Sequence, residues 1–225
     1  MKDLLVSPKE ITKDLVVDED SSFGYFLSDS FEEKKSSLHF LVKEGKNLSL
    51  TLVDFTKSDL DIDFVIDLEE NSKATLQIAS IDSGNFTKIF HGNVNHNGIA
   101  STSLTKMAGI NSSTGTLRFL GSSYIKNGAH KSSTRQEAKI TNLSPDAKSE
   151  CSPALLIKEN DVKASHGAAL GAYDPEMLFY LMSRGISLEE SKKLITFGSL
   201  LPIIESLEDK DLVSKIKDSL GGLIL

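Results

Sequence analysis

Hydrophobic and polar residues alternate along the chain from about Ser36 to Ile157. A period of two places the hydrophobic side chains of a run on one face of a β-strand and the polar side chains on the other. The hydrophobic members of the four clearest runs are Leu38, Phe40 and Val42; Leu48, Leu50 and Leu52; Leu60, Ile62, Phe64, Ile66 and Leu68; and Ala74, Leu76 and Ile78. The alternation predicts many short strands, each with one face turned towards a core.

Turn-forming segments separate these runs, for example at residues 44–47, 82–85 and 127–128. The pattern predicts an all-β region, which a sandwich, a barrel or a β-solenoid would each satisfy. No strict repeat is present, which argues against a regular hexapeptide solenoid. The stretch from Ser101 to Thr134 is rich in Ser, Thr and Gly but contains strand-like pieces. We therefore expect β-structure with many corners there, and not a flexible linker.

Signals for helices begin at Asp174. Asp174 is a good N-cap and Pro175 a good first helical residue. Gly185 can adopt the left-handed conformation that ends a helix. Ser187 and Glu190 have the spacing of a capping box and predict the start of a second helix.

The second predicted helix carries Leu194, Ile195 and Phe197 on its hydrophobic side, and we expect Pro202 to break or restart it. A last amphipathic helix is expected to stop at Gly221–Gly222. The chain therefore divides into three predicted regions. They are an N-terminal segment (1–35) that leads into the core, a β-core (36–170) and a C-terminal helical domain (171–225).

Charge and hydropathy exclude several classes of function. The net charge is −7, and phosphate neutralisation needs clustered Lys and Arg, so no nucleic-acid partner is expected. The acidic excess lies in residues 1–70, which hold 17 Asp and Glu against 8 Lys and Arg. We interpret it as a solvated face, with a docking surface for a basic partner as the alternative.

No hydrophobic run approaches the roughly 18 residues of a membrane span, and the first residues lack the hydrophobic core of a signal peptide. We therefore expect a cytoplasmic protein without membrane association. Cys151 is the single cysteine of the chain. Neither an internal disulfide nor a four-thiolate metal site can form within one chain.

Four segments near the C-terminus form a more specific pattern. They are Pro153–Ile157 (Pro-Ala-Leu-Leu-Ile), Asp161–Ala168 (Asp-Val-Lys-Ala-Ser-His-Gly-Ala), Leu178–Leu181 (Leu-Phe-Tyr-Leu) and Ser183–Ser187 (Ser-Arg-Gly-Ile-Ser). In this order and spacing they resemble the C-terminal signature of the SufB/SufD family, whose members take part in iron–sulfur cluster assembly. The likeness is close from about residue 140 to 200, and the Ser-His-Gly sequence places it nearer to SufD than to SufB.

The resemblance implies a mainly β fold, with a right-handed parallel β-helix (the SufBD core) followed by a small C-terminal α-helical domain. It implies a scaffold of the SUF system that is not an enzyme and that works with a SufC-like ABC-type ATPase, where the ATPase activity would reside. It also implies dimerisation through the β-helix, as a homodimer or with a SufB/SufD-type chain. The helices after Asp174 are then the expected docking surface for the ATPase, with Asp174, Phe179, Tyr180 and Arg184 as candidates.

The chain departs from the family pattern in several respects. It has about half the usual length and lacks the N-terminal helical region. Ala164 stands where SufD-type members commonly carry a Cys, and the cluster-forming Cys of SufB falls near Ala147, four residues from Cys151. His166 matches the family histidine that faces the cluster-forming site. His166 and Cys151 are therefore the candidate cluster or metal ligands, and we expect no tightly bound cofactor beyond a transient iron–sulfur cluster.

Each candidate also has a purely structural interpretation. His166 would cap the turn between the β-core and the helices, and Cys151 would be a small, half-buried strand residue. Phe179 and Tyr180 point about 100° apart on a helix, so one of them would pack inward while the other faces a partner. Arg184 would satisfy carbonyl groups at a helix end.

The other histidines are scattered and are expected at the surface; they are His39, His91, His96 and His130. The sequence has no phosphate-binding loop, dinucleotide-binding glycine pattern or nucleophile elbow. No enzyme motif therefore competes with the scaffold interpretation.

Asp59, Asp61 and Asp63 alternate with hydrophobic residues and so line one face of a predicted strand. We interpret this acidic row as a charged sheet edge that opposes aggregation. The alternative is a Ca²⁺ site, or a β-solenoid carbohydrate-active enzyme or binding protein that uses the carboxylates around Asp61.

Overall fold

The computed structural model describes residues 2–5, 13–28 and 35–223. Its strands are β1 (Lys2–Leu5), β2 (Lys13–Val17), β3 (Ser21–Leu27), β4 (Lys35–Val42), β5 (Asn47–Asp54), β6 (Leu60–Leu68), β7 (Lys73–Asp82), β8 (Thr87–His96), β9 (Thr102–Asn111), β10 (Thr116–Ile125), β11 (Ser133–Asn142), β12 (Lys148–Ile157) and β13 (Lys163–Gly171). Its helices are α2 (Pro175–Ser183), α3 (Leu188–Ile204) and α4 (Lys210–Leu223).

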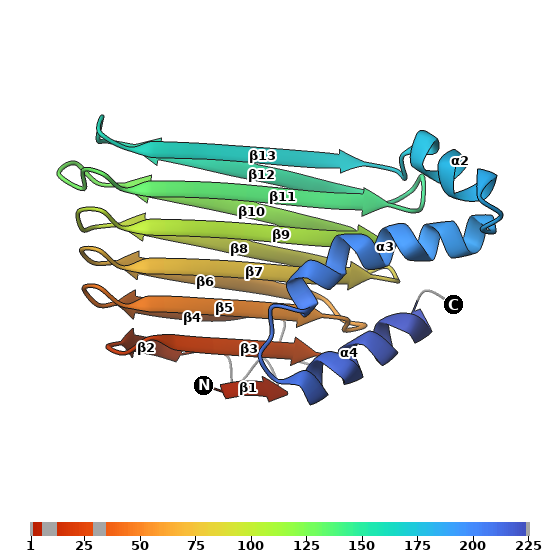
Figure 1. Cartoon of the computed structure of the whole chain (residues 1–225), viewed down its shortest axis with the longest axis horizontal. Coiled ribbons are helices and arrows are strands. Elements are labelled where there is room, and N and C mark those ends of the chain that lie inside the picture. The colour runs from red at the N-terminus through yellow and green to blue at the C-terminus, as the bar shows by residue number, and fades with distance from the viewer. Residues whose placement is uncertain (1, 6–12, 29–34, 224–225) are drawn as a thin grey trace.

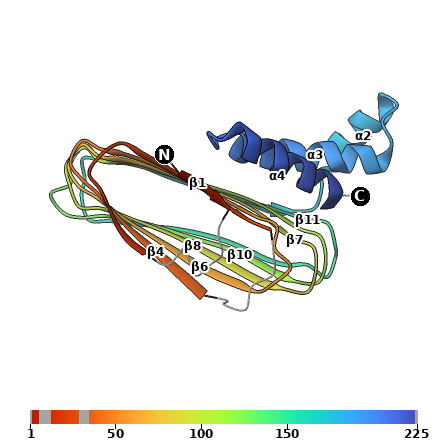
Figure 2. The ribbon, with the colours of Figure 1, turned by 90° about the horizontal axis from the view of Figure 1, so that it is seen from below.

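The strands form two parallel sheets (Figure 1). The odd-numbered strands form a seven-stranded sheet in the order β1-β3-β5-β7-β9-β11-β13, which we call sheet A. The even-numbered strands form a six-stranded sheet in the order β12-β10-β8-β6-β4-β2, which we call sheet B. Consecutive strands therefore alternate between the sheets, and each pair makes one turn of a β-solenoid. Viewed along its axis, the solenoid is a flattened tube (Figure 2), and the predicted parallel β-helix is confirmed.

The side chains that point into the tube form one continuous hydrophobic core. Every hydrophobic residue of the four alternating runs is buried, which confirms the predicted strand faces. Each Leu, Ile or Phe removed from water in this way contributes about 1.5–3 kcal/mol to stability. The N-terminal segment 1–35 contributes β1, β2 and β3 to the same sheets.

A buried ion pair lies beside this core and has no counterpart in the sequence interpretation. The ammonium group of Lys88 donates to the carboxylate of Asp54 over 2.8 Å, and both side chains are fully buried. Lys88 also donates to the carbonyl oxygens of Thr56 and Ile81. Two buried charges are tolerated only when hydrogen bonds satisfy them in this way.

The turns that lead from sheet B to sheet A share a backbone feature. Gly45, Asn71, Ala100 and Lys131 have φ values of 69°, 54°, 53° and 60°, and each lies in a successive turn of this kind. Glycine and asparagine tolerate this left-handed region best. The turn segments 44–47 and 127–128 predicted from the sequence belong to this edge of the solenoid, where the stacked turns set the spacing between coils.

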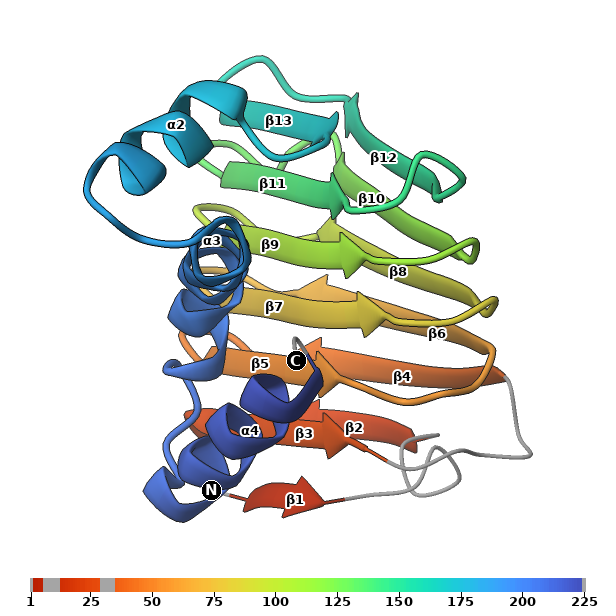
Figure 3. The same cartoon turned by 90° about the vertical axis from the view of Figure 1, so that its right-hand side faces the viewer.

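Helices α3 and α4 cover part of the outer face of sheet A (Figures 2 and 3). Their buried residues form a second hydrophobic cluster with outward-facing residues of the sheet, among them Phe26, Val53 and Phe55. The predicted caps are confirmed, because Asp174 caps α2 and Ser187 and Glu190 form the capping box of α3. Among the described residues, no helix packs on the outer face of sheet B (Figure 2).

Three predictions about the helices are wrong. Helix α3 continues through Pro202, whose missing N–H affects only the last turn of the helix. Helix α4 includes Gly221–Gly222, with Leu220 buried beside them in the hydrophobic cluster. Leu194 is 51% exposed, while Thr196 lies on the buried face of α3, because the position of the helix over the sheet decides which side is covered.

Candidate functional site

The last turn of the solenoid, formed by β12 and β13, is open. β12 pairs with β10 and β13 pairs with β11, and neither has a neighbour on its other edge within the described ranges. No residue of these two strands is buried, whereas every second residue of most inner strands is. Unpaired strand edges and exposed hydrophobic side chains are the usual features of a surface that joins another chain. We call this surface the open end.

The exposed hydrophobic side chains of the open end were not singled out from the sequence. Leu156, Ile157 and Leu170 are 54%, 39% and 50% exposed. Alternation in the sequence predicts strands here as it does elsewhere in the core. It carries no information on whether a further turn follows, and so the exposure of these residues appears only in the structure.

His166 lies on β13 at the open end. It pairs in register with Gln136 of β11, so the two side chains point to the same side of sheet A. Gln136 is buried, with its amide nitrogen donating to Ser123 Oγ and the Ala154 carbonyl. His166 occupies the equivalent position one turn later, where no strand covers it, and it is exposed. The imidazole is therefore accessible at the end of the tube.

Cys151 lies on β12 and is half-buried against the core. Its Sγ lies 3.9 Å from the carbonyl oxygen of Ala169 on β13. Burial, together with the neighbouring carboxylate of Glu150, raises the pKa of the Cys151 thiol to about 11. The thiol is protonated at neutral pH in this environment and is a poor metal ligand until its surroundings change.

The structure does not bring His166 and Cys151 together within one chain. Cys151 faces Ala169, which is three residues from His166 along β13. At the rise of a β-strand, three residues correspond to roughly 10 Å. In the part of the chain that the structure describes, no group of three or more His, Cys, Asp or Glu side chains could hold a metal ion.

Helix α2 is the second exposed feature. None of its residues is buried, and Met177, Phe179, Tyr180 and Met182 are 48%, 75%, 55% and 47% exposed. Phe179 and Tyr180 therefore both face outward, and the expectation that one of them packs inward is wrong. The helix extends beyond the solenoid and contacts mainly α3 (Figures 1 and 3).

The polar candidates of α2 shape this surface. Asp174 caps the helix by accepting a hydrogen bond from the Glu176 amide over 2.9 Å. The guanidinium of Arg184 lies 5.4 Å from the ring centroid of Tyr180, a cation–π distance. The backbone amide of Arg184 donates to Leu181, so Arg184 also ends the helix. Asp174 and Arg184 thus fix the two ends of a hydrophobic helix that has no partner on its outer side among the described residues.

The acidic row lies on the outer face of β6 and is engaged by neighbouring strands. Asp61 contacts Lys35 and His91 over 3.3 Å each, and Asp63 accepts from Asn93 over 2.8 Å. Asp59 accepts from a backbone amide at the start of β8. β6 lies within sheet B, with β4 and β8 on either side. The interpretation of this row as a sheet edge is therefore wrong; its carboxylates form cross-strand pairs, as expected inside a polar sheet face.

The remaining histidines have separate environments. His39 pairs with Asp67 over 2.6 Å, and His130 lies 3.3 Å from Glu159. His91 and His96 both belong to β8. His96 is fully buried, contrary to the surface prediction, because its alternation places it inside the tube.

Comparison with known proteins shows which family and which relatives the chain is similar to. The family described as "SUF system FeS cluster assembly, SufBD core domain" matches residues 16–199. The iron–sulfur cluster assembly protein SufD of Bacillus subtilis is 37% identical over 141 residues, which cover 61% of this chain and 32% of that protein. SufD of Escherichia coli is 36% identical over 75 residues, covering 33% of this chain and 18% of that protein.

A SufBD family protein of Pyrococcus horikoshii is 40% identical over 65 residues, or 29% of this chain and 15% of that protein. The aligned segments span about a third or less of these relatives. No helix of the described residues is both long and hydrophobic enough to cross a membrane. The parallel solenoid, its C-terminal helices and the match over residues 16–199 together show that the chain belongs to the SufB/SufD family of SUF-system iron–sulfur cluster assembly proteins.

Proposed function

We propose that this chain is a non-catalytic scaffold of iron–sulfur cluster assembly that joins a second SufB/SufD-type chain at its open end and an ATPase at α2. Family membership supports the role in cluster assembly. The observation that carries the assignment of the two surfaces is that hydrophobic side chains are exposed on β12, β13 and α2, while the inner strands are buried.

The open end suits a second solenoid. Strands β12 and β13 present free backbone donors and acceptors on one edge, and a strand of a partner can pair with them as in β-augmentation. Either a second copy or a related chain with the same fold would offer such strands. Joining would cover Leu156, Ile157 and Leu170, and would bring ligands from the partner towards His166 and Cys151. The transient cluster would then form between two chains.

Helix α2 suits a protein partner with a hydrophobic groove. Aromatic residues and arginine are enriched among residues that dominate binding energy, and Phe179, Tyr180 and Arg184 lie close together on α2. We assign this surface to a SufC-like ATPase, whose nucleotide cycle would supply the energy that the scaffold lacks. The carboxylates around Asp61 are already paired with side chains of neighbouring strands. This pairing gives no support to the alternative of a carbohydrate-active enzyme or binding protein.

Co-purification with the SufC-like ATPase of the same cell tests this assignment. We expect a stable complex with the unmodified chain at micromolar concentrations. Phe179→Ala/Tyr180→Ala should weaken it by a factor of about 100 or more, since each exposed anchor typically contributes about 2 kcal/mol. Val16→Ala is the matched control, because Val16 is 61% exposed on β2, away from α2.

A complex that survives the double substitution would show that the ATPase binds elsewhere. The lack of any complex with the unmodified chain would contradict the docking role altogether. Circular dichroism of the variant checks that the helices persist, so that loss of binding is not loss of folding.

A further inference from the structure

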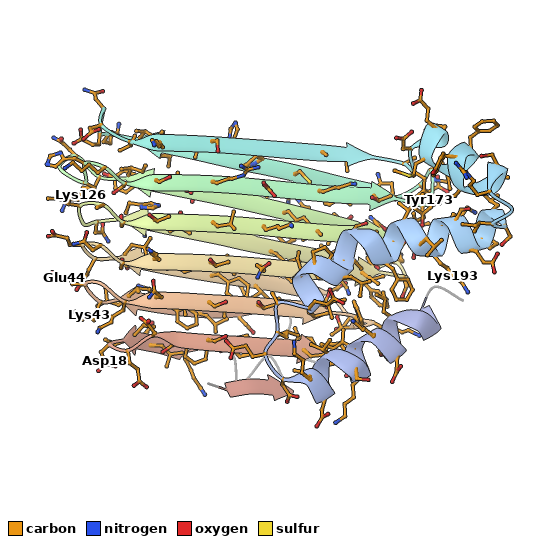
Figure 4. The ribbon with its side chains drawn as sticks, viewed as in Figure 1. Asp18, Lys43, Glu44, Lys126, Tyr173 and Lys193 are labelled. Atoms are coloured by element: carbon orange, nitrogen blue, oxygen red, sulfur yellow. The ribbon has the colours of Figure 1, made fainter. Side chains whose placement is uncertain are left out.

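A cavity of about 450 Å³ lies between the outer face of sheet A and the first half of α3. This size is within the range of about 300–1,000 Å³ that is typical of small-molecule sites. Tyr173, in the segment between β13 and α2, lies at its edge (Figure 4). The cavity is separate from the exposed outer side of α2 and from the acidic row. Neither the open end nor the ATPase-docking surface uses it.

The floor of the cavity is hydrophobic and its rim is polar. Ile81, Ile110, Leu143 and Leu178 supply aliphatic surface from β7, β9, the end of β11 and α2. The polar lining residues are Ser112, Asn142, Tyr173, Glu189, Lys192 and Thr196. A hydrophobic floor with a few converging polar groups is the usual composition of a site for a small organic molecule.

Several hydrogen-bond donors lie around this rim. The hydroxyl groups of Tyr173 and Thr196 lie 2.8 Å apart. One of them donates its proton to the other, and the second hydroxyl keeps a proton that it can donate elsewhere. Thr196 is fully buried, and burial raises the pKa of Tyr173, so its hydroxyl is neutral at physiological pH. Asn142 accepts a hydrogen bond at its side-chain oxygen from Ser149, which leaves the amide nitrogen as a donor.

One cation lies at the same rim. The ammonium group of Lys192 donates to Glu189 over 2.9 Å and has further N–H donors. Lys192 and Glu189 line the same cavity as the hydroxyl pair of Tyr173 and Thr196. The Lys192 ammonium has N–H donors that Glu189 does not use, and together with the neutral donors of the rim they offer an anionic oxygen several hydrogen bonds.

We propose that this cavity binds a small monocarboxylate with a short aliphatic body. The carboxylate accepts hydrogen bonds from Lys192, Tyr173 and Asn142, while Thr196 accepts from or donates to Tyr173 behind it. The aliphatic chain covers Ile81 and Ile110. Charge-assisted bonds to a carboxylate are the strongest of this kind. A ligand bound there contacts both the solenoid and α3, so it would stabilise the packing of the helices against sheet A.

Titration of the ¹⁵N-labelled chain with hexanoate tests this site. We expect saturable shifts of the amide signals of Ser112, Tyr173 and Thr196, with a Kd of about 1 mM, which is reasonable for a ligand of this size. Hexylamine, which has the same chain and the opposite charge, should leave these signals unshifted. Lys192→Gln should weaken hexanoate binding about tenfold. Lys193→Gln is the matched control, because Lys193 lines a different hollow beside Phe197.

Filling the cavity gives an independent test. Ala172 lines the cavity and is exposed, so Ala172→Phe should abolish binding and keep the dispersed spectrum of the folded chain. Leu178→Phe serves the same purpose if the first variant does not fold. The proposal is overturned if hexanoate gives no shifts at about 10 mM, if the shifts persist in the filled variant, or if hexylamine binds as well as hexanoate.

Discussion

At the residue scale, Gly98 has no room for a side chain. It lies in the turn between β8 and β9, where a Cβ atom would meet the Glu70 amide nitrogen at 2.1 Å and the Glu69 carbonyl carbon at 2.4 Å. These atoms belong to the backbone of the preceding turn and cannot rotate away. The close approach of stacked turns therefore requires glycine at this position.

Gly98→Ala should lower the free energy of unfolding by about 3 kcal/mol, since relief of the clash requires movement of the backbone. Urea unfolding followed by circular dichroism measures the change. Gly167→Ala is the matched control, because a Cβ atom there would meet nothing within 4 Å, and it should stay within about 0.5 kcal/mol of the unmodified chain. Equal effects of the two substitutions would argue against the tight stacking of turns.

His96 makes stability depend on pH. Its ring nitrogens lie 2.8 Å from Ser101 Oγ and 2.9 Å from Ser103 Oγ. Burial lowers the pKa of His96 to about 4 from its usual 6.5. Because the unfolded state binds a proton below pH 6.5 and the folded state does not, stability from this residue is complete above pH 6.5 and is lost as pH falls towards 4.

We therefore expect the free energy of unfolding to fall by about 2 kcal/mol between pH 6.5 and pH 4.5. His96→Gln keeps one donor and one acceptor but has no proton to take up, so its unfolding free energy should change much less over the same interval. Denaturant unfolding at several pH values measures both slopes. Parallel slopes for the two proteins would show that His96 is not the group responsible.

At the element scale, three stacked side chains line the corner where sheet A leads to sheet B. Asp82, Asn111 and Asn142 are paired in register on β7, β9 and β11. Asp82 Oδ1 accepts from the Gly84 amide, while Asp82 Oδ2 and Asn111 Oδ1 are buried without a hydrogen-bond partner among the described residues. Two adjacent acceptors without a donor between them are costly.

Asp82→Asn supplies the missing donor and should stabilise the chain at pH 7 by about 1 kcal/mol. Burial raises the pKa of Asp82 in the folded state above its usual 3.8. As the pH falls towards 3.8, Asp82 becomes protonated in the folded chain and its unfavourable charge is lost. The stability gained by Asp82→Asn should therefore become smaller at acidic pH. Thermal unfolding at neutral and acidic pH measures the difference. Asp146→Asn, at an exposed loop residue, is the control, and destabilisation by Asp82→Asn would contradict this account of the corner.

The strands of this fold were largely predictable, because a period of two survives in every coil from β4 to β9. Caps such as Asp174 and Ser187 were predictable for the same local reason, since a cap depends on a few neighbouring residues. The exposure of Phe179, Tyr180 and Leu194 was not, because it depends on where the helices rest on sheet A. The burial of His96 follows the alternation of β8, but a histidine and a lysine at inward positions do not mark the face as buried. The partner that makes a buried Lys88 tolerable, Asp54, lies far away in the sequence and left no local signal.

At the scale of the whole molecule, residues that come later in the sequence of a solenoid lie further along its axis. The described acidic residues before residue 71 therefore lie in the first coils, while the open end lies in the last. Every inner strand has a neighbour on both edges, so the only broad unpaired surfaces among the described residues lie at the two ends of the tube. The candidate ligands His166 and Cys151 were found from the resemblance, yet only the structure places both in the last turn of the solenoid without bringing them together.

The most direct measurement of whether the open end joins two chains is the molar mass in solution, by sedimentation or light scattering, for this chain alone and mixed with a SufB/SufD-type chain of the same cell. We expect a two-chain particle in one of the two samples, against 24.5 kDa for the single chain. Leu156→Asp/Leu170→Asp should return it to single chains, because charges would replace side chains that are 54% and 50% exposed. Val16→Asp, on β2 away from the open end, should not. Single chains in both samples at micromolar concentrations would contradict the proposed joining surface.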